Sequence, residues 1–472
     1  MFAASRRHGA EWYARCFGAA SMLPVRRSHA LARVLGCLLA ALAAISGAHA
    51  ARAEVIPPPV EMPAQLSLDE ALRIFRTRGL DLLIAEAAVA SAEGDARIAN
   101  AVPNPDVSFS YGRVIGNYSA DVPGCAGCSA NAWTAGVSDS AAILDTLSGK
   151  RALRLRVAKN ALASARLARV DAQRTLEAQL KQQYVQVALA RRSLEFAKDV
   201  VTTLTKTVEL SRALTPGKIT EADLARTELQ KLEAEQAVDA AVLALRQARL
   251  GLAFILGVRG PVPDFDVDSS TLNFTVPTSL SGVNEESLDR LAVERRPDLR
   301  AQGYQRARAE ASLALAKRQL FPDITLSANY SQIGNGQSVV QPPTLSFGIS
   351  APLPVFYQQQ GEIRKAEADF DTQALEHAKT TAQVISDVGN AYASYVAWKR
   401  MVERMEGGGL LSRAKFARDT TEIQYRAGKV ALIDFLDASR TYIATTVEYL
   451  QDLTNYWTAV YQLEQAVGTA LR

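Results

Sequence analysis

The chain has 472 residues, and its 53 Lys and Arg against 49 Asp and Glu give a formal net charge of +4. The first fifty residues hold six Arg and one Glu, so 47 basic and 48 acidic residues remain after them. A near-neutral chain argues against a nucleic-acid partner. Beyond that segment the His and Cys residues are His377, Cys125 and Cys128. Zinc or general-base chemistry is hard to assemble from so few, and we expect no enzyme, cofactor or metal site.

Residues 1–50 have the pattern of a secretory signal peptide. A basic flank ending at Arg33 precedes an apolar run at 34–45, and Ala48-His49-Ala50 is a small-x-small cleavage site. The apolar run is too short to span a bilayer as a mature helix. Met22 is an alternative start to Met1. The sequence therefore predicts an exported protein.

The chain contains one pattern written twice, at residues 66–112 and 286–331. In each copy a helical pattern ends at a Pro-Asp dipeptide and a strand pattern begins. The matched pairs are Asp81-Leu82 with Asp298-Leu299, Pro105-Asp106 with Pro322-Asp323, and, further on, Gly217-Lys218 with Gly428-Lys429. Duplication predicts two repeats of the same elements, at 51–256 and 286–472, with a connector at 257–285.

Each repeat is predicted to hold one short helix, one medium helix and long helices. The short helix of the first repeat begins at the capping box Ser67-Leu68-Asp69-Glu70. The other helices are predicted at 81–100, 149–211, 220–256, 297–320, 361–425 and 432–470, with an interruption at Gly407-Gly408-Gly409. Apolar residues at three and four spacing in the long helices favour antiparallel coiled coils, with an ordinary soluble helical bundle as the alternative.

Four segments alternate apolar residues with small polar ones, as membrane barrel strands do. They lie at 107–112, 133–138, 324–331 and 345–351. A soluble sandwich also alternates but needs more strands to close its core. In lipid every strand edge must be paired, and a barrel needs at least about eight strands. One chain must therefore share its barrel with copies of itself, in cyclic symmetry.

With these features the chain resembles the outer-membrane efflux family over 66–471. The resemblance rests on the duplicated Asp-Leu helix that ends in Pro-Asp, on the Tyr-x-x-Gly-Lys turn at 425–429, and on Asp434-Phe435-Leu436-Asp437-Ala438. The segments at 147–151 and 351–356 look most like the branch that serves heavy-metal resistance pumps of the cobalt–zinc–cadmium type.

The resemblance implies a mixed α and β fold and a homotrimer. Each chain would give four strands to a shared twelve-stranded outer-membrane β-barrel, and its coiled-coil helices would form a periplasmic α-barrel. The implied partners are a periplasmic adaptor (membrane fusion) protein, an inner-membrane RND pump and outer-membrane lipid. The implied function is passive conduction of substrate, with heavy-metal cations favoured. Organic toxicants or secreted peptides are alternative cargoes, and a soluble periplasmic coiled-coil scaffold is the alternative of another class.

The predicted gate centres on Asp434 and Asp437, which lie three residues apart and so share one helical face. In a trimer they would form two stacked carboxylate rings at the periplasmic mouth, and such rings favour cations. The alternative is a solvated helix start, where Asp is favoured by the helix dipole. In the first repeat Asp223 matches Asp434, but Arg226 stands at the position that matches Asp437. The first repeat is therefore expected to supply either one carboxylate ring or a salt bridge.

The resemblance assigns Tyr425 to a latch of the closed mouth, and coiled-coil packing is the alternative. The turns at Gly217-Lys218 and Gly428-Lys429 are expected at the tips that face the adaptor. Cys125 and Cys128 lie between the first two strands, in a loop expected outside the cell. An oxidising compartment favours a disulfide between them.

Overall fold

The computed structural model describes residues 57–58, 62–113, 115, 131–214, 220–333 and 342–471. The chain divides into two compact units, Met1–Pro58 and Pro59–Arg472, and every element described below belongs to the second. The predicted signal peptide at 1–50 lies outside the described residues.

The first half of this unit follows the predicted order of elements. It contains α3 (Leu68–Arg78), α4 (Leu80–Asn100), β2 (Asp106–Arg113), β3 (Asn131–Ser138), α5 (Ala142–Leu147), α6 (Lys150–Leu214) and α7 (Glu221–Ile255). Ser67 Oγ accepts a hydrogen bond from the Glu70 backbone N–H at 3.2 Å, so the predicted cap does begin α3. The short helix α5 has no counterpart among the predicted elements.

The connector between the halves carries short regular elements rather than a plain loop. It contains β4 (Asp266–Val267), η1 (Ser269–Leu272) and η2 (Thr278–Leu280), and β4 pairs in parallel with β1 (Gln65–Leu66). The Tyr184 hydroxyl donates to the Leu66 carbonyl at 2.8 Å and accepts from the Asp268 N–H at 3.0 Å. The two short strands are thereby attached to α6.

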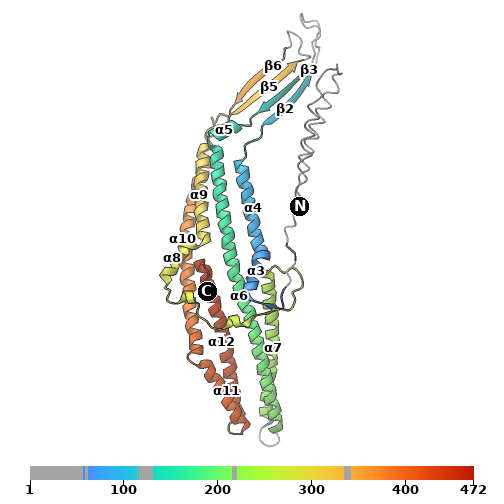
Figure 1. Ribbon diagram of the computed structural model, residues 1–472, viewed down its shortest axis with the longest axis vertical. Helices are drawn as coiled ribbons and strands as arrows, with labels where there is room; N and C mark the ends of the chain where they lie inside the picture. Colours follow the sequence, from blue (N-terminus) through green and yellow to red (C-terminus); the bar gives the residue numbers. More distant parts are fainter. Residues whose placement is uncertain are drawn as a thin grey trace, which may run out of the picture. The chain divides into compact units, whose positions relative to one another are not determined.

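The second half repeats the order of the first (Figure 1). It contains α8 (Glu285–Arg295), α9 (Pro297–Arg318), β5 (Thr325–Ile333), β6 (Thr344–Ser350), α10 (Gln360–Glu406), α11 (Leu410–Arg426) and α12 (Leu432–Val467). The predicted interruption at 407–409 separates α10 from α11. Gly409 has φ of +68°, and a Cβ on Gly408 would lie 2.4 Å from the Arg404 carbonyl oxygen. This break therefore depends on glycine.

The long helix α6 is the centre of the helical part. It packs against α4, α7, α9 and α12, and its 65 residues correspond to about 98 Å at 1.5 Å per residue. The core around it contains the fully buried rings of Tyr184, Tyr456 and Tyr461. No helix in the described part of the chain is both long enough and apolar enough to cross a membrane.

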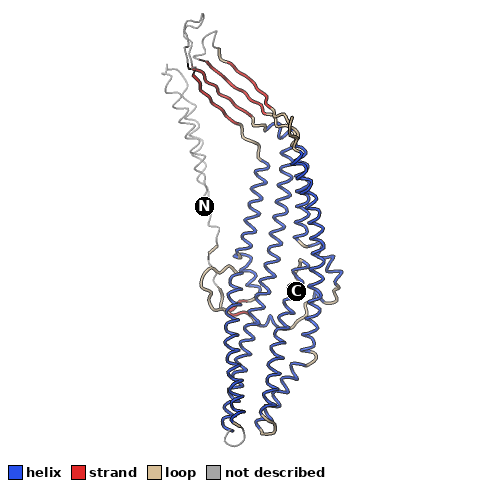
Figure 2. Tube along the Cα trace, turned by 180° about the vertical axis from the view of Figure 1, so that it is seen from behind, coloured by secondary structure: helices blue, strands red, loops and turns tan. Residues whose placement is uncertain are grey.

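The four long strands form one antiparallel sheet in the order β2-β3-β5-β6, so a β3–β5 pair joins the two halves (Figure 2). Among the described strands, β2 and β6 each have one edge without a partner. The register places Val107, Val137, Ala328 and Phe347 in a row on one face, and Ser108, Gly136, Asn329 and Ser346 in a row on the other. The apolar face is uncovered: Val107 is 82% exposed and Phe347 is 79% exposed.

Candidate functional site

The turn between α11 and α12 has the backbone geometry of a Schellman motif. The Lys429 N–H donates to the Gln424 carbonyl and the Gly428 N–H donates to the Tyr425 carbonyl, both at 2.9 Å. Gly428 has φ of +70°, which glycine adopts without a steric penalty. Gly428 and Lys429 are exposed at this tip. Their predicted equivalents, Gly217 and Lys218, lie outside the described residues.

Asp434 and Asp437 lie in the first turns of α12, directly after this tip, and both are exposed. Asp434 Oδ2 accepts a hydrogen bond from the Ala431 N–H at 3.2 Å, so this carboxylate caps the helix start. Asp437 makes no hydrogen bond or ion pair with any described residue. The two carboxylates therefore differ: among the described residues, Asp434 caps a helix and Asp437 has no hydrogen-bonding or ion-pair partner.

Tyr425 is buried beside them and joins the tip of the α11–α12 hairpin to α6. Its ring stacks on Phe435, with centroids 5.7 Å apart and planes at 6°. Its hydroxyl lies 3.1 Å from the hydroxyl of Ser211, which belongs to the last turn of α6. A small cluster of Tyr425, Leu432, Phe435 and Leu436, with Leu210 against it, is separate from the main core. The tyrosine is thus packed in this cluster, and its hydroxyl contact also links α11 to α6.

Asp223 lies in the first turn of α7, and residues of the same turn hold its side chain. The Thr220 hydroxyl donates to Asp223 Oδ2 at 2.7 Å and accepts from the Asp223 N–H at 3.1 Å. Asp223 Oδ1 lies 3.3 Å from the guanidinium of Arg226. Within the described residues no hydrogen bond or ion pair joins it to Asp434 or Asp437. Of the two possibilities for this repeat, the structure contains the salt bridge.

The remaining candidate residues give no further site. Cys125 and Cys128 lie outside the described residues. In the described part of the chain, no three His, Cys, Asp or Glu side chains come together as metal ligands would. His377 lies half-buried on α10.

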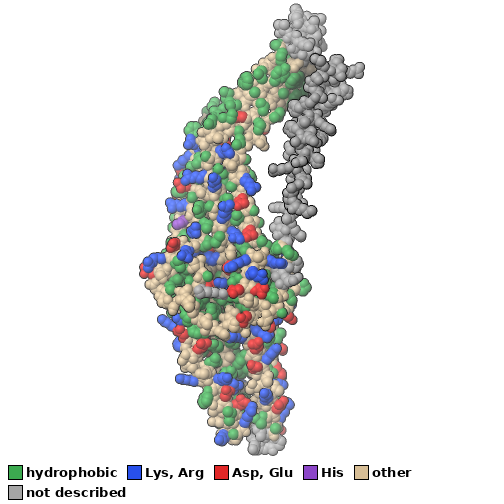
Figure 3. Space-filling model, in the orientation of Figure 1, with side chains coloured by type: hydrophobic (Ala, Val, Ile, Leu, Met, Phe, Trp, Pro, Cys, Tyr) green, Lys and Arg blue, Asp and Glu red, His purple; other side chains and the backbone are tan. Residues whose placement is uncertain are grey.

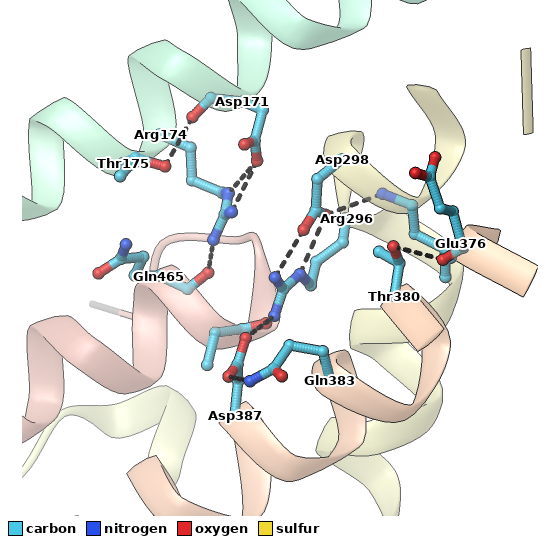
Figure 4. A network of polar contacts seen from close by, with 12 residues as sticks. Asp171, Arg174, Thr175, Arg296, Asp298, Glu376, Thr380, Gln383, Asp387 and Gln465 are labelled. Atoms are coloured by element: carbon cyan, nitrogen blue, oxygen red, sulfur yellow. Dashed lines mark hydrogen bonds and ion pairs between the residues drawn. The ribbon is translucent and has the colours of Figure 1, made fainter. Parts of the chain in front are cut away.

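A buried ion-pair network, not anticipated from the sequence, holds the end of α12 (Figure 4). The side chain of Arg296 is 7% exposed and contacts Asp298 at 2.6 Å and Asp387 of α10 at 2.9 Å. It also donates to the Ala466 carbonyl in the last turn of α12. Arg174 of α6 donates to the neighbouring Gln465 carbonyl. Four helical segments are therefore held together by two guanidinium groups.

In this network the Arg296 guanidinium and the Asp298 carboxylate each stabilise the charged form of the other. Burial alone would lower the pKa of Arg296, but its bonds to Asp298 and Asp387 outweigh burial and raise it. Burial would likewise raise the pKa of Asp298, and the bond to Arg296 lowers it instead. The sequence marked Asp298 as a match to Asp81, yet gave no signal for Arg296, whose partner Asp387 is 91 residues away.

The repeated Pro-Asp dipeptides fix the junctions between helices and strands. Asp323 accepts from Lys150 at 2.7 Å, and Lys150, only 6% exposed, also donates to the Phe321 carbonyl. Asp106 accepts from the Ser140 hydroxyl at 2.8 Å. Both carboxylates therefore bond to the stretch of chain that runs from the end of β3 to the first residue of α6.

A family model described as "Outer membrane efflux protein" matches the chain at residues 72–258 and again at 288–469. The chain belongs to the outer membrane efflux protein family. Its members are trimeric, non-enzymatic channels that work with a periplasmic adaptor and an inner-membrane pump.

Curated relatives and solved structures agree with this membership. The efflux protein is 23% identical over 420 residues to the cobalt-zinc-cadmium resistance protein CzcC of Cupriavidus metallidurans, covering 87% of this chain and 92% of that one. It is 27% identical over 397 residues to the pyoverdine export outer membrane protein OpmQ of Pseudomonas putida, covering 80% of each. The crystal structure of CusC matches with a TM-score of 0.70 at 18% identity, over 89% of this chain and 98% of that one.

The family places the efflux protein in the outer membrane, with its helices forming a tunnel in the periplasm. It is the non-enzymatic outer-membrane duct of a tripartite pump. The soluble scaffold considered from the sequence is thereby excluded. The four-stranded sheet and the turn between α11 and α12 lie at opposite ends of the long helices (Figure 1).

Proposed function

We propose that three copies of the efflux protein close a twelve-stranded barrel and conduct heavy-metal cations outward from an RND-type pump. The observation that carries the proposal is the open sheet: among the described strands, one edge of β2 and one edge of β6 have no partner, and the apolar face is exposed. Lipid cannot satisfy unpaired backbone groups, so β6 of one copy is expected to pair with β2 of the next.

Exposed apolar residues on the helices support the same assembly. On α7 they recur at coiled-coil spacing at Leu229, Leu232, Leu243 and Leu250. On α11, Phe416 and Ile423 are seven residues apart and exposed. Such seams are expected to be covered by helices of a neighbouring copy, which would complete the tunnel wall.

At the periplasmic mouth, Asp434 and Asp437 are proposed to form the cation-selective rings. The strongest support for this role is that the exposed carboxylate of Asp437 has no hydrogen-bond or ion-pair partner among the described residues. Asp223 forms an ion pair with Arg226. We propose that this ion pair lies at the same periplasmic mouth as the two rings. Tyr425 is proposed to latch the closed mouth, and the tips at Gly217-Lys218 and Gly428-Lys429 are proposed to meet the adaptor.

The heavy-metal assignment is supported by the similarity to CzcC, which is named for cobalt, zinc and cadmium resistance. The similarity to OpmQ, named for pyoverdine export, keeps an organic cargo as the second candidate. A deletion strain separates the two: hypersensitivity to cobalt, zinc or cadmium with unchanged tolerance of organic toxicants supports the metal assignment, and the reverse contradicts it.

The assembly is tested by the mass and projected shape of the detergent-purified particle. A trimer that projects as a three-fold cylinder supports the barrel. A membrane-free monomer, with its sheet packed on its own helices, contradicts it.

The proposal also includes the repeat boundaries at 51–256 and 286–472, the signal peptide at 1–50 and the Cys125–Cys128 disulfide. N-terminal sequencing and thiol titration of the purified protein test the last two.

A further inference from the structure

Exposed apolar side chains gather where the sheet meets the helices. Leu147, at the end of α5, is 74% exposed, and Phe356, in the segment between β6 and α10, is fully exposed. Ile143 and Leu353 are exposed beside them in the chain. In Figure 3 hydrophobic side chains cover the sheet and this junction, whereas Lys and Arg appear over the helices beyond it. The junction thus continues the apolar face of the sheet.

The start of α6 adds an unusual run of positive charge to this junction. Residues 150–170 hold seven Lys and Arg and no Asp or Glu. Lys150 and Arg151 lie in the first turn of α6, where the helix dipole disfavours positive charge. Further along, Arg166 and Arg169 pair with Glu93 and Glu86 of α4. Arg156 and Lys159 are exposed and make no ion pair or hydrogen bond with any described residue.

The carboxylates nearest the junction pair with Lys150 and Arg154 of this run or accept other bonds, and they leave Arg156 and Lys159 without a partner among the described residues. Asp145 pairs with Arg154 at 2.6 Å. Asp323 pairs with the buried Lys150, and Glu362 accepts a hydrogen bond from the Tyr357 hydroxyl at 2.7 Å. Two further exposed cations lie at the same junction, Arg318 at the end of α9 and Lys365 in the second turn of α10.

We propose that this junction binds the periplasm-facing leaflet of the outer membrane as an anionic-phospholipid collar. The collar consists of Ile143, Leu147, Leu353 and Phe356 as its apolar part, and of Arg156, Lys159, Arg318 and Lys365 as its basic part. An apolar face beside basic residues is the arrangement that binds anionic interfaces. The proposal rests on the membrane barrel proposed above.

The geometry of α6 fits this role. Lys159 lies nine residues beyond Lys150, about 14 Å along the helix. Helical side chains lean toward the N-terminus of their helix, which here is the end next to the sheet. Long basic side chains also extend along apolar surface toward charged groups. From their positions on α6, side chains as long as those of Arg156 and Lys159 are expected to extend toward phosphates at the edge of the sheet.

The first test compares lipid retention by the purified full-length protein in mixed micelles of phosphatidylglycerol and phosphatidylcholine, read by native mass spectrometry. The wild type should retain phosphatidylglycerol in excess. Arg156→Gln with Lys159→Gln should lose most of that preference, at about fivefold per charge. Lys198→Gln with Lys206→Gln is the matched control, because both lysines are exposed and unpaired among the described residues further along α6. Equal preference in the two double variants would overturn the proposal.

The second test asks what covers the apolar part. Phe356→Trp should add a fluorescence signal that is quenched more by phospholipid brominated near the glycerol than by lipid brominated at the chain end. A signal that neither lipid quenches means that water or a second copy covers this residue, and overturns the collar. The particle mass separates the two proposals. A wild type that is not trimeric contradicts the barrel, and a trimer without lipid preference contradicts only the collar.

Discussion

The hydroxyl of Tyr425 lies 3.1 Å from the hydroxyl of Ser211, and both residues are buried. This contact joins α11 to the end of α6, so the tip of one helical hairpin is attached to the tip of the other within a single chain. Any outward movement of the α11–α12 tip must break it or carry α6 along.

Tyr425→Phe is expected to loosen the closed mouth. It keeps the stacking on Phe435 and removes one buried hydrogen bond, which contributes about 1 kcal/mol. We expect a higher open probability in single-channel recordings in planar bilayers. Tyr392→Phe is the control, because its hydroxyl bonds the Val283 carbonyl in the main core. An open probability that stays at the wild-type level would show that the contact only packs the coiled coil.

The two gate carboxylates are expected to respond differently to neutralisation. Asp437→Asn should reduce cation preference without loss of stability, because Asp437 has no partner among the described residues. Asp434→Ala should reduce cation preference and also cost about 1 kcal/mol, because it removes a helix cap. Reversal potentials in a salt gradient, with thermal unfolding alongside, measure both effects. An unchanged reversal potential in the Asp434→Ala and Asp437→Ala double variant would refute the rings.

Arg296→Met is expected to destabilise the protein by about 3–5 kcal/mol, because it leaves two carboxylates without their cation in a mostly buried site. Arg73→Met is the control, since its ion pair with Glu70 is largely exposed and contributes little. Thermal unfolding of the two variants in the same detergent gives the comparison. Equal losses of thermal stability in Arg296→Met and Arg73→Met would mean that the buried network stabilises the protein no more than an exposed ion pair does.

The same network predicts a pH dependence. The folded pKa of Asp298 is lowered by Arg296, so its contribution to stability is present above the unfolded pKa of about 3.9 and is lost as pH falls through the folded value. The wild type should therefore lose thermal stability below about pH 4. Arg296→Met should show a smaller loss over that window, since Asp298 is then no longer stabilised as an anion. If the wild type and Arg296→Met lost the same thermal stability below about pH 4, the Asp298–Arg296 ion pair would not be the cause of the pH dependence.

Two glycines in helical surroundings are expected to respond to alanine with opposite signs. A Cβ on Gly408 would meet the Arg404 carbonyl at 2.4 Å, so Gly408→Ala must displace the backbone between α10 and α11. Gly303 lies inside α9 with nothing within 4 Å of its Cβ position, so Gly303→Ala should stabilise by up to about 1 kcal/mol. Denaturation midpoints measure both, and a stabilised Gly408→Ala variant would show that the break is not required.

The helices and strands were predictable because their signals are local. Apolar periodicity, the Ser67 cap and the Pro-Asp dipeptides define element order, and Gly407-Gly408-Gly409 marks the break. The six-residue helix α5 was not predictable, since it is too short for a period and follows two residues with positive φ, Ser140 and Ala141. Its position is set by Asp139, which accepts hydrogen bonds from the N–H groups of Leu326 and Ala141.

The candidate gate was predictable in part. The spacing of Asp434 and Asp437 placed them on one face, and the repeat pointed to Asp223. The sequence could not show that Tyr425 reaches Ser211, because the two are 214 residues apart. The contacts of Arg296 with Asp387 and of Lys150 with Asp323 were missed for the same reason, because only the fold brings these residues together.

The β3–β5 pair has a consequence for how such a pore could have arisen. It joins the last strand of one hairpin to the first strand of the next within a single polypeptide. In the proposed barrel, the join from β6 of one copy to β2 of its neighbour repeats that geometry. An unduplicated ancestor with one hairpin would have needed every join to form by encounter between separate molecules. After gene fusion, every second pairing between hairpins lies within one polypeptide. The formation of those pairings therefore no longer depends on protein concentration.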